Sequence, residues 1–185
     1  MSRNIILYSL LGIFIFSCKG PEARRPVQRT SGTFIKESIE RNKKIYEQDK
    51  SKIFELMEAH PENTYLASNN GFWYYYHQQD SISLQTPQFG DQVTFYYNVK
   101  DLNGNTILSE SDLGLQNYIV DQNQQELISG IRDGIKLMKL GETITFLFPS
   151  YMAYGYYGLE NKLGTNVPVQ STITLKSINQ KQENQ

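Results

Sequence analysis

The sequence predicts an α+β fold: an antiparallel half-barrel sheet wrapped around one helix and preceded by a long N-terminal helix. Three observations lead to this prediction. Short segments with alternating apolar residues recur between residues 72 and 175, and a hairpin turn lies between two of them. One segment inside this stretch has apolar residues three or four positions apart, as in a helix. A longer segment with helical spacing comes before all of these strands.

The composition excludes several classes of function. A hydrophobic content of 39% with 12% aromatic residues is enough to fill the core of one medium domain. The formal net charge of −1 gives no basic surface for nucleic acid. Cys18 is the only cysteine, and His60 and His77 have no cysteine, histidine or paired carboxylates close in sequence. We therefore expect no nucleic-acid partner, no metal site, no cofactor and no catalytic triad.

Residues 1–17 are predicted to be a lipoprotein signal peptide. Arg3 precedes an apolar run, Ile5–Phe16, that is shorter than the ~20 residues a membrane-spanning helix needs. The run ends in Ile15-Phe16-Ser17-Cys18, which resembles a bacterial lipobox. We expect export, lipidation of Cys18 and attachment to a bacterial membrane on its periplasmic side, with inner and outer membrane both open. The alternative is an ordinary signal peptide with an incidental cysteine.

Residues 18–32 combine Gly, Pro and Arg with few apolar residues, which predicts a tether for the lipid-anchored domain. Residues 33–60 then form an amphipathic helix, with Thr33 as N-cap and Pro61 just past its end. This helix either packs on the domain or pairs with a second copy, which would give a homodimer through Thr33–Ala59. We expect residues 64–180 to fold without it and residues 181–185 to be a disordered tail.

The first half of the domain reads as strands and turns. The strand Phe72–Tyr76 has aromatic residues on both faces, so one face should lie beneath another element. Val93–Val99 alternates in the manner of a half-buried strand. Asn103-Gly104 is a strong hairpin signal, and Thr106–Ser109 is the returning strand.

The second half holds the helix and the closing strands. Tyr118–Val120 is a short strand, and Glu126–Leu140 is predicted to be helical, with Gly141 just past its end. Apolar residues alternate along Ile144–Phe148 and return along Thr172–Leu175. The domain is therefore predicted to contain one helix among several antiparallel strands.

A loop rich in Tyr and Gly separates the last two strands. Pro149 ends the first strand because it has no N–H to donate. Gly155 and Gly158 allow the chain to curl back over the end of the sheet, and Val167-Pro168 restarts the extended chain. The strand, the loop and the returning strand should enclose an apolar pocket with the phenol of Tyr154 at its rim. We interpret this pocket as a binding site.

Several motifs in this stretch resemble those of FKBP-type peptidyl-prolyl isomerases. The resemblance covers about Gly71 to Ile178, and it includes a loop similar to the family's I-P-x-x-x-A-Y-G. With the anchored N-terminus, the chain resembles most the lipoprotein isomerases associated with gliding motility. The motifs are Gly90-Asp91-Gln92-Val93, Leu102-Asn103-Gly104, Glu126-Leu127-Ile128-Ser129-Gly130-Ile131, Met138-Lys139-Leu140-Gly141-Glu142 and Phe148-Pro149-Ser150-Tyr151-Met152-Ala153-Tyr154-Gly155.

The resemblance implies a proline pocket and roles for its residues. Tyr154 would donate its hydroxyl to a substrate carbonyl, the Ile128 backbone N–H would do likewise, and Tyr97 would complete the catalytic set. The remaining substrate-binding residues would be Leu108, Leu127, Ile131, Val167 and Leu175. Plain core packing explains Leu127, Ile128, Ile131 and Leu175 equally well. A phenol on a glycine-flanked loop, in contrast, is not a natural core residue.

The chain departs from the family at five positions. Ile107-Leu108 stands where the family commonly has Phe-Asp, so the pocket loses a carboxylate. Ile131 replaces a tryptophan, Leu175 replaces a phenylalanine, and Gln116 falls on another pocket phenylalanine. These changes widen the pocket and make it less aromatic, which puts full turnover and the binding of macrolide inhibitors in question.

The function implied by the resemblance is cis-trans isomerisation of X–Pro bonds in proline-containing client polypeptides. The isomerase would assist the folding of extracytoplasmic proteins, including those of a gliding-motility apparatus. Two alternatives stay open: a non-catalytic holdase that grips apolar-proline segments, and a scaffold lipoprotein that retains the fold. Leu108 and Ile131 favour the alternatives, whereas Tyr154 with Leu127-Ile128 favours the enzyme.

Overall fold

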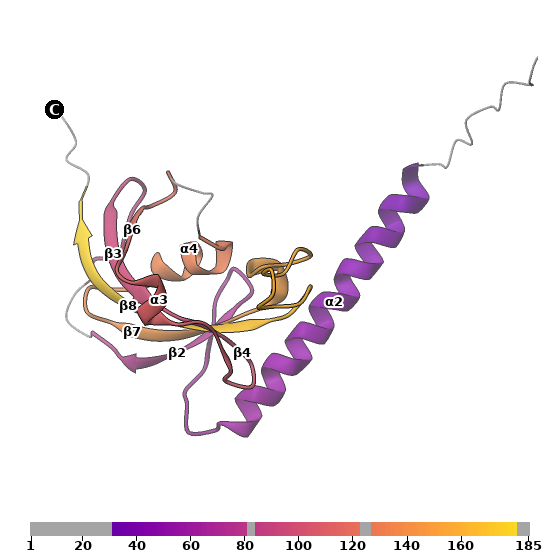
Figure 1. Cartoon of the computed structure of the whole chain (residues 1–185), viewed down its shortest axis with the longest axis horizontal. Coiled ribbons are helices and arrows are strands. Elements are labelled where there is room, and N and C mark those ends of the chain that lie inside the picture. Colours follow the sequence, from indigo (N-terminus) through magenta and orange to yellow (C-terminus); the bar gives the residue numbers. More distant parts are fainter. Residues whose placement is uncertain (1–30, 81–83, 123–126, 181–185) are drawn as a thin grey trace, which may run out of the picture. The chain divides into compact units, whose positions relative to one another are not determined.

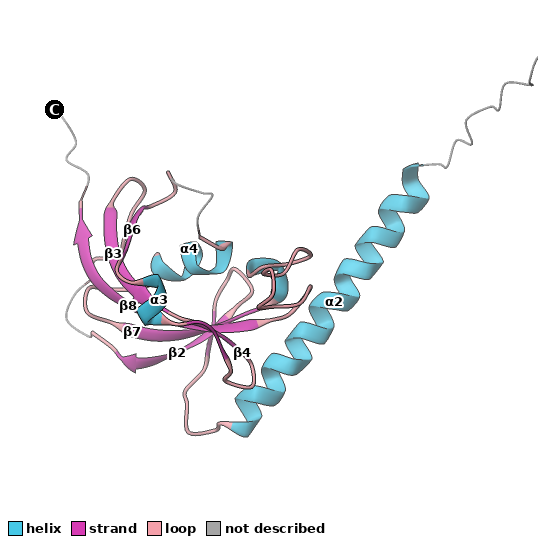
Figure 2. Ribbon diagram, viewed as in Figure 1, coloured by secondary structure: helices cyan, strands magenta, loops and turns pink. Residues whose placement is uncertain are grey.

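The computed structural model describes residues 31–80, 84–122 and 127–180, and these residues confirm the predicted α+β class with an N-terminal helix and an antiparallel sheet (Figure 1, Figure 2). The chain divides into two units, Met1–Glu37 and Ser38–Gln185. The predicted signal peptide, Cys18, most of the tether and the tail at 181–185 lie outside the described residues. Within the described ranges, no helix is both long enough and apolar enough to cross a bilayer.

One antiparallel sheet carries the fold. Its main path runs β1-β2-β7-β8-β3-β6, and β4 pairs with both β5 and β8. The longest strand, β8, bonds to β7, β3 and β4 and so lies at the centre. The strands are β1 (Leu66–Ala67), β2 (Trp73–Gln78), β3 (Gln92–Tyr97), β4 (Val99–Asp101), β5 (Thr106–Leu108), β6 (Gln116–Ile119), β7 (Thr143–Phe148) and β8 (Val169–Asn179).

The helices differ from the prediction in length and number. They are α2 (Ser31–Ala59), α3 (Glu110–Leu113), α4 (Ser129–Ile135) and a 3₁₀ turn, η1 (Ser150–Met152). The helix predicted over 126–140 is wrong in extent, because after Ile135 the chain tightens into turns in which Leu137 N–H bonds to Gly134 O. Met138 stays fully buried in these turns, so the apolar spacing continues without the helix. The short helix α3 was not predicted, since four residues are too few to show a period.

The main core lies between α4 and one face of the sheet. Ile131 and Ile135 of α4 are buried together with Phe146 and Phe148 of β7, whose rings stack 5.6 Å apart. A Cβ atom at Gly130 would stand 2.6 Å from the Phe148 ring, closer than atoms can pack. Glycine at this position therefore lets the first turn of α4 lie directly on β7.

A second core lies on the opposite face, under α2. Ile53 of α2 is buried with Trp73 of β2 and Leu147 of β7, and Phe54 meets the Trp73 ring edge-on at 5.2 Å. The prediction that one face of the aromatic strand lies beneath another element is confirmed, and α2 is that element. That residues 64–180 fold without this helix stays a prediction, and the burial of Ile53 with Trp73 and Leu147 argues against it.

Candidate active site

The loop after β7, which we call the flap (residues 149–158), is held by a short set of backbone hydrogen bonds. The carbonyl of Ser150 accepts the N–H groups of Ala153 at 3.0 Å and Gly155 at 2.8 Å. Gly155 has φ +53, which permits the tight turn, and its carbonyl accepts the Asn166 N–H at 2.8 Å. Both neighbours of Tyr154 are thus tied to Ser150, and the phenol is presented from a fixed backbone.

Two phenols lie next to each other at this site. Tyr97 is the last residue of β3 and is buried, and Tyr154 is half-buried on the flap. Burial, together with a smaller effect of the neighbouring Tyr97, raises the pKa of Tyr154 to about 12. Burial also raises the pKa of Tyr97. Both hydroxyl groups therefore keep their protons at neutral pH, where each can donate a hydrogen bond.

The structure brings most of the predicted site residues to the main core around these phenols. Ile131 of α4 and Leu175 of β8 are fully buried beside Tyr97 in this core. The half-buried residues that pack on it are Leu108, Leu127, Ile128 and Tyr154. Ile128 is the N-cap of α4, and N–H groups at a helix start have no acceptor within the helix. The site thus has a buried apolar layer that contains Ile131 and Leu175. At its partly exposed edge lie two hydrogen-bond donors, the Tyr154 hydroxyl and the Ile128 N–H.

Val167 is the exception among the predicted residues. Among the described residues it is not one of those that pack on the main core, and it lines a separate hollow of about 500 Å³ with Leu56 of α2 and Leu102. The expectation that Val167 lines the same pocket as Tyr154 stays a prediction. Pro168, the residue after Val167, is buried just before β8 and lines the same hollow.

Two of the residues that depart from the family pattern make contacts that stabilise the fold. Leu108, at the end of β5, pairs with Val99 and packs on the core where the resemblance expects a carboxylate. Gln116 directs its amide Nε2 to the carbonyl of Leu113 at 2.6 Å, which ties β6 to the end of α3. These side chains support the fold around the two phenols.

Comparison with protein-family models matches residues 84–176 to the FKBP-type peptidyl-prolyl cis-trans isomerases. The chain belongs to this family. The activity of this isomerase is therefore the cis-trans isomerisation of peptidyl-prolyl bonds.

Solved structures share the fold of the isomerase. A peptidyl-prolyl cis-trans isomerase from Pseudomonas syringae pv. tomato superposes with a TM-score of 0.58 at 16% identity, over 75% of this chain and 96% of that chain. FkpA from Escherichia coli gives a TM-score of 0.58 at 16% identity, over 97% of this chain and 83% of its own. At this identity the likeness concerns the fold.

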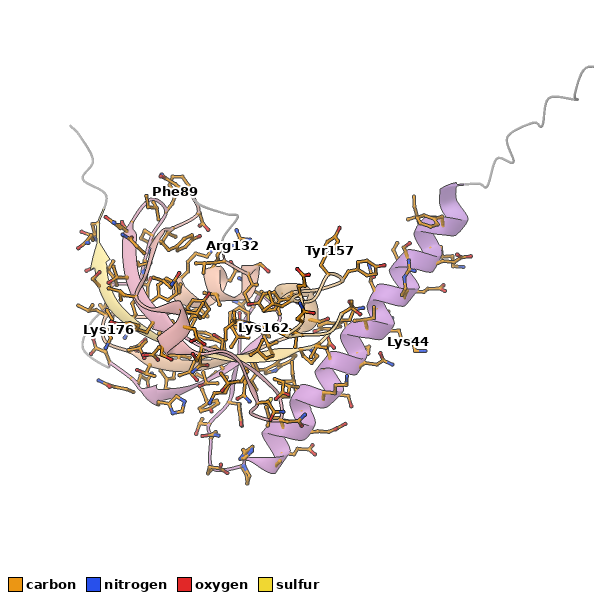
Figure 3. All side chains as sticks on the ribbon, viewed as in Figure 1. Lys44, Phe89, Arg132, Tyr157, Lys162 and Lys176 are labelled. Atoms are coloured by element: carbon orange, nitrogen blue, oxygen red, sulfur yellow. The ribbon has the colours of Figure 1, made fainter. Side chains whose placement is uncertain are left out.

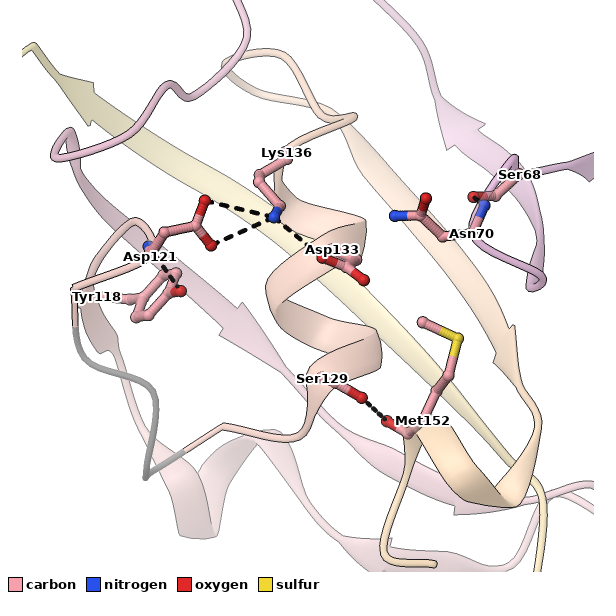
Figure 4. A network of polar contacts seen from close by, with 8 residues as sticks. All are labelled: Ser68, Asn70, Tyr118, Asp121, Ser129, Asp133, Lys136 and Met152. Carbon is pink, nitrogen blue, oxygen red and sulfur yellow. Dashed lines mark hydrogen bonds and ion pairs between the residues drawn. The ribbon is translucent and has the colours of Figure 1, made fainter. Parts of the chain in front are cut away.

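The isomerase anchors its flap to α4. The hydroxyl of Ser129, the first residue of α4, donates to the carbonyl of Met152 at 3.3 Å (Figure 4). The far end of the same helix is held by Lys136, whose Nζ lies 3.2 Å from Asp121 and 3.0 Å from Asp133. The helix that contains Ile131 and follows Ile128 is therefore fixed to both the flap and the turn after β6.

A contact from α2 reaches the same flap and was missed by sequence analysis. Asp49 accepts the Ser150 N–H at 2.8 Å through Oδ2, and both residues are buried. The sequence does contain a signal, because Tyr46, Asp49, Ile53 and Leu56 recur at helical spacing on one face of α2. A carboxylate on an otherwise apolar face needs a buried partner.

Proposed function

We propose that the isomerase binds the X–Pro segment of its client against Tyr97 and Tyr154. The Tyr154 hydroxyl and the Ile128 N–H donate hydrogen bonds to client carbonyls, while Ile131 and Leu175 form the apolar layer beneath the prolyl ring. The observation that carries this proposal is the pairing of a half-buried, protonated phenol with a buried one at the edge of an apolar core.

The chemistry needs only such a surface. The barrier to rotation about a peptide bond is ~18–20 kcal/mol, and it arises from amide resonance, which also polarises the bond. A twisted amide has lost this resonance and is less polar than a planar one. A site that is poor in water therefore favours the twisted state over the ground state, without a nucleophile or a metal ion.

The test is Tyr154→Phe, with Tyr157→Phe as its matched control. Tyr157 lies on the same flap, is 91% exposed and points away from the domain (Figure 3). A neutral hydrogen bond contributes about 0.5–1.5 kcal/mol, so Tyr154→Phe should lower kcat/KM roughly two- to tenfold. Tyr157→Phe should leave kcat/KM unchanged. Equal activity of both variants and the wild type would refute the role of Tyr154.

For its place in the cell, we propose that the isomerase is a lipid-anchored protein that helps extracytoplasmic proteins fold, among them components of a gliding-motility apparatus. The support is the lipobox-like Ile15-Phe16-Ser17-Cys18 after a short apolar run. Cys18→Ala should abolish acyl labelling and release the protein from membranes. A Cys18→Ala variant that stays membrane-bound after salt and carbonate washes would contradict the anchor.

A second candidate function is a holdase that uses the same surface with little turnover. The observation in its favour is the packing of Leu108 and Ile131 where the family commonly has an acid and a tryptophan. A holdase would bind an unfolded proline-containing client and suppress its aggregation, yet leave the rate of X–Pro exchange unchanged. The isomerase and the holdase therefore differ in their effect on the rate of X–Pro cis-trans exchange.

We also propose that α2 supplies a contact for a second copy of the chain. Its first turns expose Phe34, Ile35 and Ile39, at 69%, 56% and 62% of their full surface. Sedimentation should show a dimer that Ile39→Glu weakens. A wild type that sediments as a monomer over the micromolar range would refute this pairing.

A further inference from the structure

The starting point is a buried acidic side chain outside the family domain. Asp49 lies in the middle of α2, and the family match begins only at residue 84. The side chain is 1% exposed, and its Oδ2 accepts the backbone N–H of Ser150, 101 residues further along the chain. A hydrogen bond to a carboxylate is stronger than one between neutral groups, and removing a buried partner leaves the other unpaired.

Ser150, which donates this hydrogen bond, is itself hydrogen-bonded to the two residues that flank Tyr154. Ser150 donates its N–H to Asp49, and its carbonyl accepts the N–H groups of Ala153 and Gly155, the two neighbours of Tyr154. Through its N–H and its carbonyl, Ser150 thus links Asp49 to the backbone on both sides of the phenol.

A second contact between α2 and the flap also holds the start of η1 against this helix. The ring of Tyr46, one turn before Asp49, meets the ring of Tyr151 edge-on at 5.9 Å. The hydroxyl of Tyr151 donates to the carbonyl of Asn70 at 3.4 Å, which ties this side chain to the turn before β2. Two neighbouring positions of α2 therefore contact the first two residues of η1.

We propose that Asp49 is a positioning residue for Tyr154, so that α2 forms part of the scaffold of the active site and does more than cover the sheet. Asp49 holds the N–H of Ser150, the carbonyl of Ser150 holds the turn around Tyr154, and this turn orients the phenol toward the client. The inference rests on the proposed role of Tyr154 in isomerisation.

The experiment compares two nearly isosteric variants in the full-length protein. Asp49→Asn keeps an acceptor oxygen for the Ser150 N–H, whereas Asp49→Leu has a similar shape and none. We expect kcat/KM for an X–Pro peptide to stay within about twofold of the wild type in Asp49→Asn. In Asp49→Leu it should fall roughly two- to tenfold, the range expected for losing the Tyr154 hydroxyl itself.

Two further variants separate positioning from a general loss of stability. Ile53→Ala, one turn along α2, removes buried packing without touching the flap, so it should lower Tm and leave kcat/KM unchanged. In a Tyr154→Phe background, Asp49→Leu should cause less than about a twofold further loss, because effects that pass through one group do not add. Full additivity of the two substitutions would overturn the proposal.

The outcomes also distinguish this inference from the proposed function. A wild type without activity overturns both, whereas an active wild type with an equally active, folded Asp49→Leu overturns only the role of Asp49. Should Asp49→Leu fail to fold, Asp49→Asn carries the test through amide hydrogen exchange. The weaker neutral acceptor should speed exchange at Ala153 and Gly155 relative to the amides of β7, and unchanged exchange there would refute the proposal.

Discussion

Replacing Ile53 by alanine should destabilise the whole domain, although Ile53 lies outside the stretch that matches the family. The side chain is fully buried between Trp73 and Leu147. Alanine removes three carbon atoms, and at about 0.8 kcal/mol per buried CH₂ group the lost transfer free energy is about 2.4 kcal/mol. The cavity adds to this, within a usual range of about 2–5 kcal/mol for such a substitution. We expect about 3 kcal/mol, which lowers Tm by roughly 6–12 °C for a domain of this size.

Urea unfolding followed by circular dichroism measures this loss, with Ile39→Ala as the control on the same helix. Ile39 is 62% exposed, and surface substitutions usually change the free energy of unfolding by less than about 0.5 kcal/mol. A loss below about 0.5 kcal/mol in Ile53→Ala would refute the packing of α2 on the sheet. It would restore the interpretation from sequence, in which residues 64–180 fold alone.

Three further predictions follow from the packing and from the phenols. Gly130→Ala places a Cβ atom 2.6 Å from the Phe148 ring; it should cost about 1–3 kcal/mol in urea unfolding, and a neutral result would contradict the close approach of α4 to β7. A fragment that begins at Thr64 should aggregate in light scattering, because the face under α2 is then exposed; a monomeric, cooperatively folded fragment would show otherwise. Stability should fall between pH 10 and pH 12: burial raises the folded pKa of Tyr76 and Tyr154 to about 12, while the unfolded phenols lose their protons near 10. The urea midpoint measured at intervals from pH 8 to pH 11.5 checks this, and a flat profile above pH 10 would contradict the burial of both phenols.

Local patterns in the sequence were enough to predict the sheet and the flap. Alternating residues such as Val93, Phe95 and Tyr97 mark a strand whatever it pairs with, and all three are buried in β3. Asn103-Gly104 predicts its hairpin because the turn demands a positive φ, and Gly104 has φ +87. Tyr154 stood out for a similar local reason, as a phenol on a glycine-flanked loop.

The features that local patterns did not predict depend on contacts between distant segments. Nothing near Asp49 in the sequence indicates that its partner is the Ser150 N–H, 101 residues away. Val167 lines a hollow with Leu56 of α2 and Leu102, and periodicity carries no information on which distant segments meet there. The polar stretch around Arg41 to Lys44 interrupts the apolar face of α2, so the sequence alone left open whether this helix packs on the domain or on a second copy.

The most direct test of the account is the rate of cis-trans exchange in an X–Pro peptide, measured by NMR exchange spectroscopy with and without the full-length protein. Uncatalysed exchange takes tens to hundreds of seconds. Catalysis at the surface around Tyr97 and Tyr154 predicts an exchange rate that rises in proportion to protein concentration, with a smaller slope for Tyr154→Phe. An exchange rate that stays at the uncatalysed value at every protein concentration would contradict it.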